Sequence, residues 1–296
     1  MRRLLALALP LLLLTAACSD GTATSSGADT TVAGSDTTIA NAATTTSPDK
    51  PKVAVPATMP TKLVVTDLTV GTGPAAATGT EVVLNYVGVR SADGTEFDNS
   101  YDRGEPFQVL LGAGKVIPGW EQGLVGVQAG GRRQMDIPAE LAYGDKGAGD
   151  VIKPGDALSF VVDVIAVLPG TSKADEPAIT LAPAANIATI ANKDLVVGTG
   201  ATPTNGTQFA AQIMLFRADT GELLNSTWGS PPVLFSFTKD SNTFPGIIAT
   251  AKGMKVGGRR QSQVPYQLMF DGKGQSQINL PAAIDVVLVM DLVAVY

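Results

Sequence analysis

The sequence contains one long pattern twice, and this duplication limits the chain to folds that occur as two similar modules. VAVPATMPTKLVVTDLTVGTG from Val53 and TLAPAANIATIANKDLVVGTG from Thr180 align without a gap. The same spacing of 127 residues relates Gly131 to Gly258, and it becomes 128 toward the C-terminus. A period of this length indicates a domain duplication and not a solenoid. The length of 296 residues also agrees with two domains.

The N-terminus is typical of an export signal. Two arginines precede the apolar stretch LLALALPLLLLTAA, which is interrupted by Pro10 and is shorter than the roughly 20 residues of a membrane-spanning helix. Small residues then precede Cys18, an arrangement that resembles the lipobox of bacterial lipoproteins, although Thr15 stands where that pattern is usually aliphatic. We expect an acylated Cys18 and a lipoprotein on the outer face of the cell membrane. The alternative is cleavage after Ala17, which would leave a free thiol in a secreted protein.

Residues 19–60 are rich in Thr, Ser, Ala, Gly and Asp and contain no aromatic residue, so they predict a disordered tether. No later apolar run reaches transmembrane length. The sequence therefore predicts a signal peptide (1–17), the lipidated cysteine with its tether (18–52), a first folded domain (53–169), a linker (170–177) and a second folded domain (178–296).

Composition excludes several classes of function. Histidine is absent, which removes the commonest catalytic base and the commonest ligand of transition metals. The formal net charge of −6 argues against a nucleic-acid partner. Cys18 is the single cysteine, so no intramolecular disulfide can form.

Each copy has the pattern of an α+β fold. In ALSFVVDVIAVL, Leu158 and Phe160 alternate with Ser159 and Val161, which predicts a half-buried antiparallel strand. One short helix is expected to begin at Pro118 and to continue through the residue pair 124–125. We expect a curved antiparallel sheet wrapped around this single helix in each copy.

Residues 53–168 resemble an FKBP-type peptidyl-prolyl cis-trans isomerase domain. The resemblance lies in the motifs LNYVG, GTEFDNSYDRGEPFQVLLG, VIPGWEQGL, GGRRQMDIPAELAYG and LSFVVDV, which occur in the family's order. It implies an apolar pocket with Trp120 at its floor, Tyr143 at its rim, and Asp98 and Arg103 along one side. The implied wall consists of Tyr86, Phe97, Phe107, Val116, Ile117, Ile152 and Phe160.

The chemistry of proline isomerisation suits such residues. Rotation about an X-Pro amide requires the loss of resonance and meets a barrier of roughly 18–20 kcal/mol. Water stabilises the charge separation of the planar amide, so a dry pocket favours the twisted state. No nucleophile, metal or cofactor is needed.

The roles follow from this picture and from the resemblance. We expect the catalytic group to be Tyr86, Phe97, Asp98, Arg103 and Tyr143, and the substrate-binding group to be Phe107, Val116, Ile117, Trp120, Ile152 and Phe160. In detail, the Tyr143 hydroxyl and the Ile117 N–H hold substrate carbonyls, Trp120 seats the proline, and Arg103 pairs with Asp98, which contacts Tyr86 and the twisting amide.

Each residue also has an ordinary structural explanation. Taken singly, the apolar residues are common in protein cores, and an Asp–Arg pair is commonly a surface ion pair of little energetic value. Their joint occurrence in the family's order favours the functional interpretation. The pair Arg132 and Arg133 is interpreted as part of the scaffold, at an exposed strand end after a double-glycine turn.

The second copy keeps the scaffold motifs and loses the site. The corresponding replacements, in chain order, are Tyr86 to Ile213, Phe97 to Leu224, Asp98 to Asn225, Trp120 to Ile247, Tyr143 to Phe270 and Phe160 to Leu288. These changes predict a degenerate, catalytically silent domain that binds client chains, binds a partner or only stabilises the first domain.

The sequence thus predicts an exported, membrane-tethered isomerase that accelerates X-Pro isomerisation in folding proteins. The expected ligands are proline-containing polypeptides and macrolides of the FK506 or rapamycin type. The main alternative is a non-catalytic chaperone or adaptor that binds extended polypeptide segments at the cell envelope. An envelope structural protein is a third possibility, supported only by the tether and the duplication.

Overall fold

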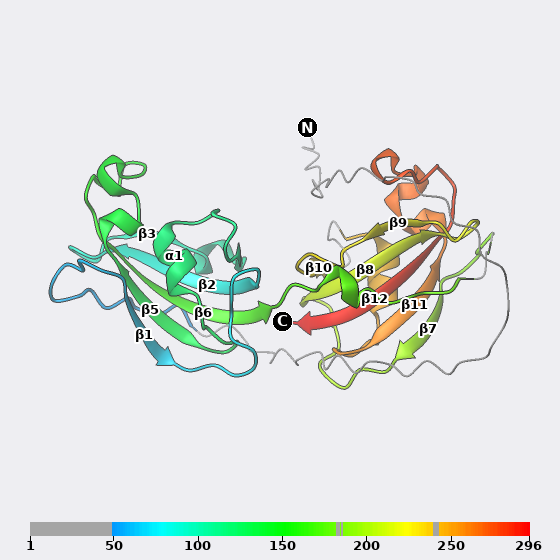
Figure 1. The fold of residues 1–296 in the computed structure, drawn as a ribbon, viewed down its shortest axis with the longest axis horizontal. Coiled ribbons are helices and arrows are strands. Elements are labelled where there is room, and N and C mark those ends of the chain that lie inside the picture. Colours follow the sequence, from blue (N-terminus) through cyan, green and yellow to red (C-terminus); the bar gives the residue numbers. More distant parts are fainter. Residues whose placement is uncertain (1–48, 182–183, 185, 239–242) are drawn as a thin grey trace. The chain divides into compact units, whose positions relative to one another are not determined.

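A computed structural model gives the fold of residues 49–181, 184, 186–238 and 243–296. The predicted signal peptide, Cys18 and most of the predicted tether lie outside these described residues. The described chain contains two antiparallel sheets of six strands, each with one α-helix (Figure 1). The duplication seen in the sequence is therefore a duplication of structure.

The first module has its strands in the order β1-β5-β6-β2-β3, and β4 also pairs with β2. Three of its 3₁₀ turns follow β3 and β5, at Tyr101–Arg103, Ala139–Leu141 and Gly144–Lys146. The strands and the helix are β1 (Val64–Thr69), β2 (Glu81–Arg90), β3 (Glu96–Asn99), β4 (Phe107–Leu110), α1 (Pro118–Gly123), β5 (Arg132–Ile137) and β6 (Leu158–Leu168).

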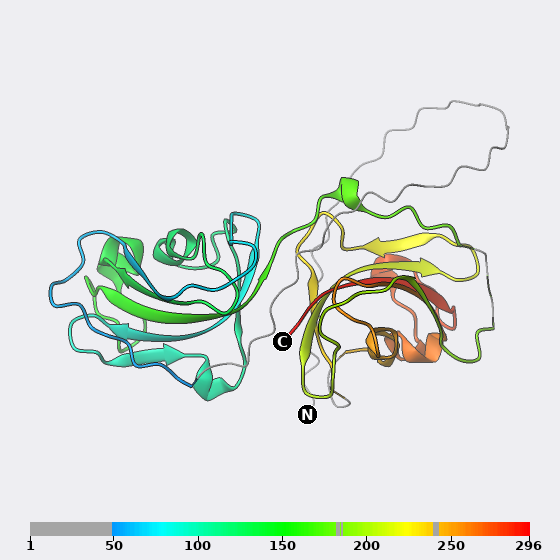
Figure 2. The ribbon, with the colours of Figure 1, turned by 90° about the horizontal axis from the view of Figure 1, so that it is seen from below.

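The second module repeats this arrangement, with the order β10-β8-β12-β11-β7 and with β9 also paired to β8. Figure 2 shows that each sheet is twisted. The 3₁₀ turns of the second module are Tyr266–Leu268, Phe270–Gly272 and Ser276–Ile278, and a further 3₁₀ turn, Lys173–Asp175, precedes this module. Its strands and helix are β7 (Ala191–Val196), β8 (Gln208–Arg217), β9 (Leu223–Ser226), β10 (Val233–Ser236), α2 (Pro245–Ala251), β11 (Arg259–Val264) and β12 (Val286–Val295).

Strand β6 is buried on both faces, so the prediction of a half-buried strand is wrong. Phe160 and its alternate neighbours face the main core, as predicted, whereas Val161 faces the other side and packs in a separate cluster. Val53 covers this second face together with Val87. The sequence pattern shows alternation, but it does not show that a segment distant in sequence covers the outer face.

The covering segment is residues 49–56, which we call the strap. In addition to the packing of Val53, the Ala54 carbonyl of the strap accepts a hydrogen bond from Gln134 Nε2 at 2.8 Å. The second module has a comparable segment, because Ile179 and Leu181 pack against the outer face of its own sheet. Asp49 and Lys50, which the sequence assigned to the tether, are thus ordered parts of the first module.

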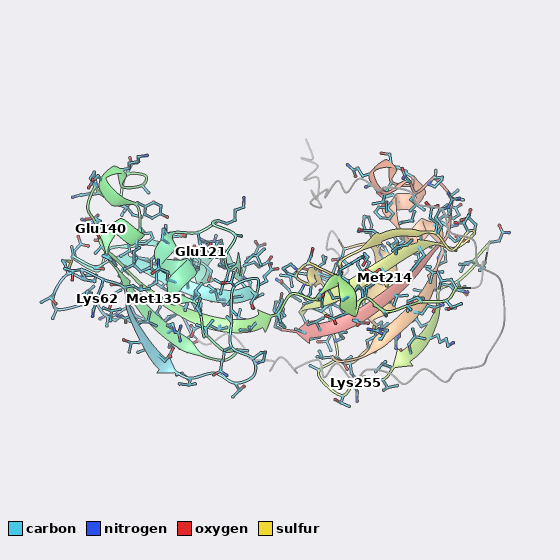
Figure 3. All side chains as sticks on the ribbon, viewed as in Figure 1. Lys62, Glu121, Met135, Glu140, Met214 and Lys255 are labelled. Carbon is cyan, nitrogen blue, oxygen red and sulfur yellow. The ribbon has the colours of Figure 1, made fainter. Side chains whose placement is uncertain are left out.

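Helix α1 ends at Gly123, earlier than predicted. Leu124 only caps it, with its N–H 3.0 Å from the Trp120 carbonyl, and the chain then turns through Gly126 at φ +84°, whose N–H bonds to Ala76 O. The helix packs closely on β5, since a Cβ at Gly123 would lie 2.5 Å from the sulfur of Met135, which Figure 3 labels. The glycine therefore sets the distance between helix and sheet.

The two arginines after the double glycine stabilise the scaffold. Arg133 binds Asp67 with two nitrogens, at 2.6 and 3.0 Å, and its third nitrogen donates to the carbonyls of Gly123 and Val125 at the end of α1. Only 8% of Arg133 is exposed, so the prediction of an exposed strand end is wrong for this residue. Arg260 repeats these contacts in the second module with Asp194 and with the carbonyls of Thr250 and Lys252 at the end of α2.

None of the helices within the described part of the chain is long and apolar enough to cross a membrane.

Candidate active site

Five aromatic rings from five elements of the first module meet beside α1. Trp120 on α1 lies edge-on to Tyr86 on β2 and to Phe160 on β6, each with ring centroids 5.2 Å apart. Phe107 on β4 approaches Trp120 to 5.8 Å, and Phe97 on β3 approaches Phe160 to 5.6 Å. Such edge-to-face contacts are the preferred geometry of aromatic pairs. We call these five residues the ring cluster.

The ring cluster is closed on its inner side and open on its outer side. Trp120 and Phe160 are 4% exposed and Tyr86 is 5% exposed, whereas Phe107 is 37% exposed; Tyr143, the predicted rim residue, is 41% exposed. Val116 and Ile117 pack against the same core and are partly exposed, and Ile152 is buried. The predicted apolar residues are thus brought together, with Trp120 beneath them.

A polar group borders the ring cluster. The Tyr86 hydroxyl donates to the carboxylate of Asp98, and the guanidinium of Arg103 binds the other carboxylate oxygen. Arg103 also donates to the Tyr86 oxygen at 2.9 Å and lies 5.5 Å from the centre of its ring. The three side chains form a closed triangle in which Asp98 is held from two directions.

Burial, together with the bond to Asp98, raises the pKa of Tyr86 to about 12. The hydroxyl of Tyr86 therefore remains a hydrogen-bond donor throughout the physiological range of pH. The pKa of Arg103 is also raised, because its charged form donates to Tyr86 and Asp98. The triangle thus keeps one carboxylate facing one phenol and one cation.

The segment that carries Asp98 and Arg103 is tied to the sheet by buried polar contacts. Ser100 accepts a hydrogen bond from the Tyr86 N–H at 3.0 Å and donates to Asn85 at 2.7 Å. Tyr101 donates to Asp163 on the outer face of β6. Sequence analysis did not identify Asn85 or Ser100, because isolated polar residues in a strand and a turn carry no distinctive pattern.

Glu121 on α1, labelled in Figure 3, is a second residue that sequence analysis missed. Its carboxylate accepts hydrogen bonds from the N–H groups of Gly112 and Gly114, at 2.6 and 2.8 Å. These contacts fix the loop that leads from β4 to Val116 and Ile117. A single glutamate on a short helix gives no sequence signal for this role.

The groups expected to bind substrate carbonyls belong to Tyr143, which is exposed, and to Ile117, which is partly buried against the core. Among the residues that the structure describes, neither the Tyr143 hydroxyl nor the Ile117 N–H has a hydrogen-bond partner, and the Ile117 carbonyl begins α1. The indole N–H of Trp120 is buried and also lacks a partner among the described residues. These three donors are thus unpaired among the described residues, and that of Trp120 is buried.

Comparison with known proteins decides the family. The model of the FKBP-type peptidyl-prolyl cis-trans isomerases matches residues 73–165, within the first module. A 121-residue stretch is 50% identical to the FK506-binding protein of Streptomyces anulatus, covering 40% of this chain and 98% of that protein. The chain belongs to the FKBP-type peptidyl-prolyl cis-trans isomerase family.

A second bacterial relative of this FKBP-type chain agrees. A probable FK506-binding protein of Corynebacterium glutamicum is 43% identical over 118 residues, which are 40% of this chain and 98% of that protein. The crystal structure of FkpA from Escherichia coli is 40% identical over 41% of this chain and 54% of that one, with a TM-score of 0.34.

The second sheet of this FKBP-type chain carries different side chains at the equivalent places. Ile247 and Leu288 are buried where the first module has Trp120 and Phe160. Phe244, in the position of Ile117, packs against Phe270 with centroids 4.7 Å apart and ring planes tilted by 54°. The triangle of phenol, carboxylate and guanidinium has no counterpart, since Ile213 and Asn225 replace its phenol and carboxylate.

Proposed function

We propose that the first module catalyses the cis-trans isomerisation of X-Pro bonds in polypeptides. The observation that carries this proposal is the contact of the ring cluster with the triangle of Tyr86, Asp98 and Arg103. An apolar surface that is bordered on one side by fixed polar groups matches a proline ring joined to a polar amide. Membership of the FKBP-type family supports the same activity.

Catalysis in this proposal requires no covalent bond. The proline ring contacts the outer rings of the cluster above Trp120, and the X-Pro amide loses water on entering. A planar amide separates charge more than a twisted one, so the loss of water destabilises the planar state relative to the twisted state. The binding energy of the flanking residues offsets the cost of twisting.

Several contacts must share the effect. Each 1.36 kcal/mol of selective stabilisation of the twisted amide gives about tenfold in rate, and one hydrogen bond contributes about 1–3 kcal/mol at most. Tyr143 and the Ile117 N–H hold the carbonyls of the substrate, while Asp98 faces the amide that rotates. Arg103 and Tyr86 keep Asp98 in one orientation.

We infer that this activity is directed at exported proteins. The apolar N-terminal stretch and the position of Cys18 support export and acylation, which would hold the protein at the outer face of the cell membrane. The ring cluster is also the proposed binding site for macrolides of the FK506 type, as the names of the relatives suggest. Mass spectrometry of the mature N-terminus tests the acylation, and a free Cys18 thiol would exclude it.

We further infer that the second module has no isomerase activity of its own. Its aliphatic replacements remove the indole and the carboxylate that the mechanism uses. The contact between Phe244 and Phe270 supports a closed apolar core at the corresponding position.

A protease-coupled assay on an X-Pro peptide tests the proposed activity in the full chain. We expect Asp98→Ala and Trp120→Leu each to lower turnover at least tenfold while the protein remains folded by circular dichroism. Unchanged turnover in both variants would reject the site. Titration with a macrolide adds a second test, because the fluorescence of Trp120 should change, whereas Trp228, buried in the second module, should not respond.

A further inference from the structure

Lys50, in the strap, contacts the segment formed by β3 and the 3₁₀ turn that follows it. Lys50 Nζ lies 2.9 Å from Glu96 Oε1 and 3.0 Å from Asp102 Oδ2. Asn99 joins the same two carboxylates, because its Nδ2 donates to Glu96 at 2.6 Å and to Asp102 at 2.8 Å. We call these four residues the strap cluster.

In the sequence, members of the strap cluster lie on both sides of Asp98 and directly before Arg103. Glu96 and Asp102 stand two positions before and four positions after Asp98, and Asp102 directly precedes Arg103. The ammonium of Lys50 therefore bridges the two ends of the stretch that presents the carboxylate and the guanidinium to Tyr86. The Asp102 N–H also donates to Asn99 Oδ1 at 2.8 Å, which closes the turn.

The strap has its own attachments, independent of the ammonium. Val53 is 8% exposed and lies in the outer cluster of the sheet. Ala54 O accepts from Gln134, and Asp49 O accepts from Arg132 at 3.3 Å. Removal of the Lys50 charge should therefore leave the strap in place. The effect of this charge on the stretch from Glu96 to Asp102 can then be measured without a change in the fold.

The second module lacks this cluster, as it lacks the site. By the spacing of 127 residues, Lys50 corresponds to Pro177, Glu96 to Leu223 and Asp102 to Gly229, so that none of the three charges is kept. The segment before the second module contacts the equivalent stretch through hydrogen bonds and not through ion pairs: Ser226 donates to Glu176, and the Gly229 N–H donates to Thr171 Oγ1 at 3.2 Å. By contrast, the buried tie of Ser100 to the β2 backbone is repeated by Thr227 and the Ile213 N–H, as expected of a scaffold contact. The strap cluster thus accompanies the site and not the fold.

We propose that Lys50 is a positioning residue of the isomerase, which holds the stretch from Glu96 to Asp102 so that Asp98 and Arg103 face the twisting amide. This inference rests on the proposed function.

The experiment compares three variants of the full chain. Lys50→Met removes the charge and keeps the apolar stem, Lys50→Arg keeps the charge, and Lys52→Met removes a neighbouring exposed charge for which the described residues provide no ion pair. We expect Lys50→Met to lower kcat for an X-Pro peptide about threefold, a change of the size that exposed ion pairs give, with KM nearly unchanged. Lys50→Arg and Lys52→Met should stay close to wild type, and hydrogen exchange over residues 96–104 should be faster only in Lys50→Met.

The outcomes separate this inference from the proposed function. No turnover in the wild-type protein would overturn both. Wild-type turnover that Lys50→Met leaves intact, or that Lys52→Met lowers equally, would overturn the role of Lys50 alone. A fall in kcat that Lys50→Arg does not rescue, or that follows a general loss of thermal stability, would also overturn it.

Discussion

The ring of Phe270 lies 4.7 Å from the ring of Phe244, measured between centroids, and these two positions correspond to Tyr143 and Ile117 of the first module. Both phenylalanines pack against the core of the second module. The apolar bulk that the inner positions lost, when Trp120 and Phe160 became Ile247 and Leu288, is thus partly regained nearer the surface. The residues equivalent to Trp120 and Phe160 are thus aliphatic and buried in the second module.

A matched pair of substitutions tests which module is active. Trp120→Leu in the full chain should lower turnover of an X-Pro peptide at least tenfold, because the ring beneath the proline is lost. Ile247→Leu, at the equivalent position of α2, should leave turnover within twofold and changes volume little. Activity that survives Trp120→Leu and disappears in Ile247→Leu would assign the catalysis to the second module.

The raised pKa of Tyr86 predicts a loss of stability in alkali. Its ordinary value is 10.0, and burial with the bond to Asp98 raises the folded-state pKa to about 12. A raised pKa means that the folded state binds the proton more tightly than the unfolded state. The stabilisation is therefore complete below pH 10 and is lost as the pH rises toward 12, by no more than about 1.4 kcal/mol per pH unit.

The measurement is urea unfolding of the wild type and of Tyr86→Phe at several values of pH. Burial also raises the pKa of Tyr101 and Tyr296, so both proteins should lose stability in alkali. The difference between them isolates Tyr86, and the wild type should lose more between pH 10 and pH 12. Parallel curves for the two proteins would contradict the assignment.

Much of the fold could be predicted from the sequence, because regular patterns of residues indicate it. The alternation along β6 and the proline at the start of α1 depend on neighbours in sequence, whereas the duplication shows itself as a constant spacing of 127 residues, and each has its counterpart in the structure. The ends of the elements were predicted less well. The shorter α1 depends on Gly126, whose N–H bonds to Ala76, fifty positions away.

The candidate site shows the same division. The aromatic residues were found because their types and order form motifs, and the structure places them around Trp120. The contacts that Glu121, Ser100 and Lys50 make around the site join residues 7 to 52 positions apart. Lys50 was placed in the tether because the low-complexity composition continues up to it, and composition does not register one specific ion pair.

We expect substitution of Arg133 to lower the stability of the first module and to leave its turnover nearly unchanged. Arg133→Met would leave two carbonyls at the end of α1 without their donor and would break the bidentate pair with Asp67. Loss of a partner by buried polar groups costs about 1–3 kcal/mol each, so the first module should be destabilised by several kcal/mol. Turnover per folded molecule should stay within about twofold, because none of these atoms touches the ring cluster.

The control for Arg133 is Lys62→Met, which removes a cation from an exposed position labelled in Figure 3. It should change the free energy of unfolding by less than about 0.5 kcal/mol. The comparison is made by thermal unfolding and by turnover well below the midpoint. A loss of turnover in Arg133→Met at a temperature where it is fully folded would mean that the basic pair contributes to catalysis and not only to the scaffold.

The loop between β11 and β12 and the equivalent loop between β5 and β6 predict two stability changes of opposite sign. In the first module, Gly155 has φ +78°, and a Cβ there would meet nothing within 4 Å. The second module keeps a left-handed backbone at the equivalent place but has Ala283, at φ +58°. A left-handed conformation costs an L-residue about 1–2 kcal/mol, of which a glycine's greater freedom in the unfolded state offsets about 0.4–1 kcal/mol.

Ala283→Gly should therefore stabilise the second module by about 0.5–1 kcal/mol, and Gly155→Ala should destabilise the first module by a similar amount. Urea unfolding of the full chain, followed by hydrogen exchange of peptides from each module, assigns each change to its module. Because the site at Gly155 has open space, the effect there is one of backbone strain and not of collision. If both variants lowered stability, the two loops would not share one backbone conformation, and the equivalence of Gly155 and Ala283 would be wrong.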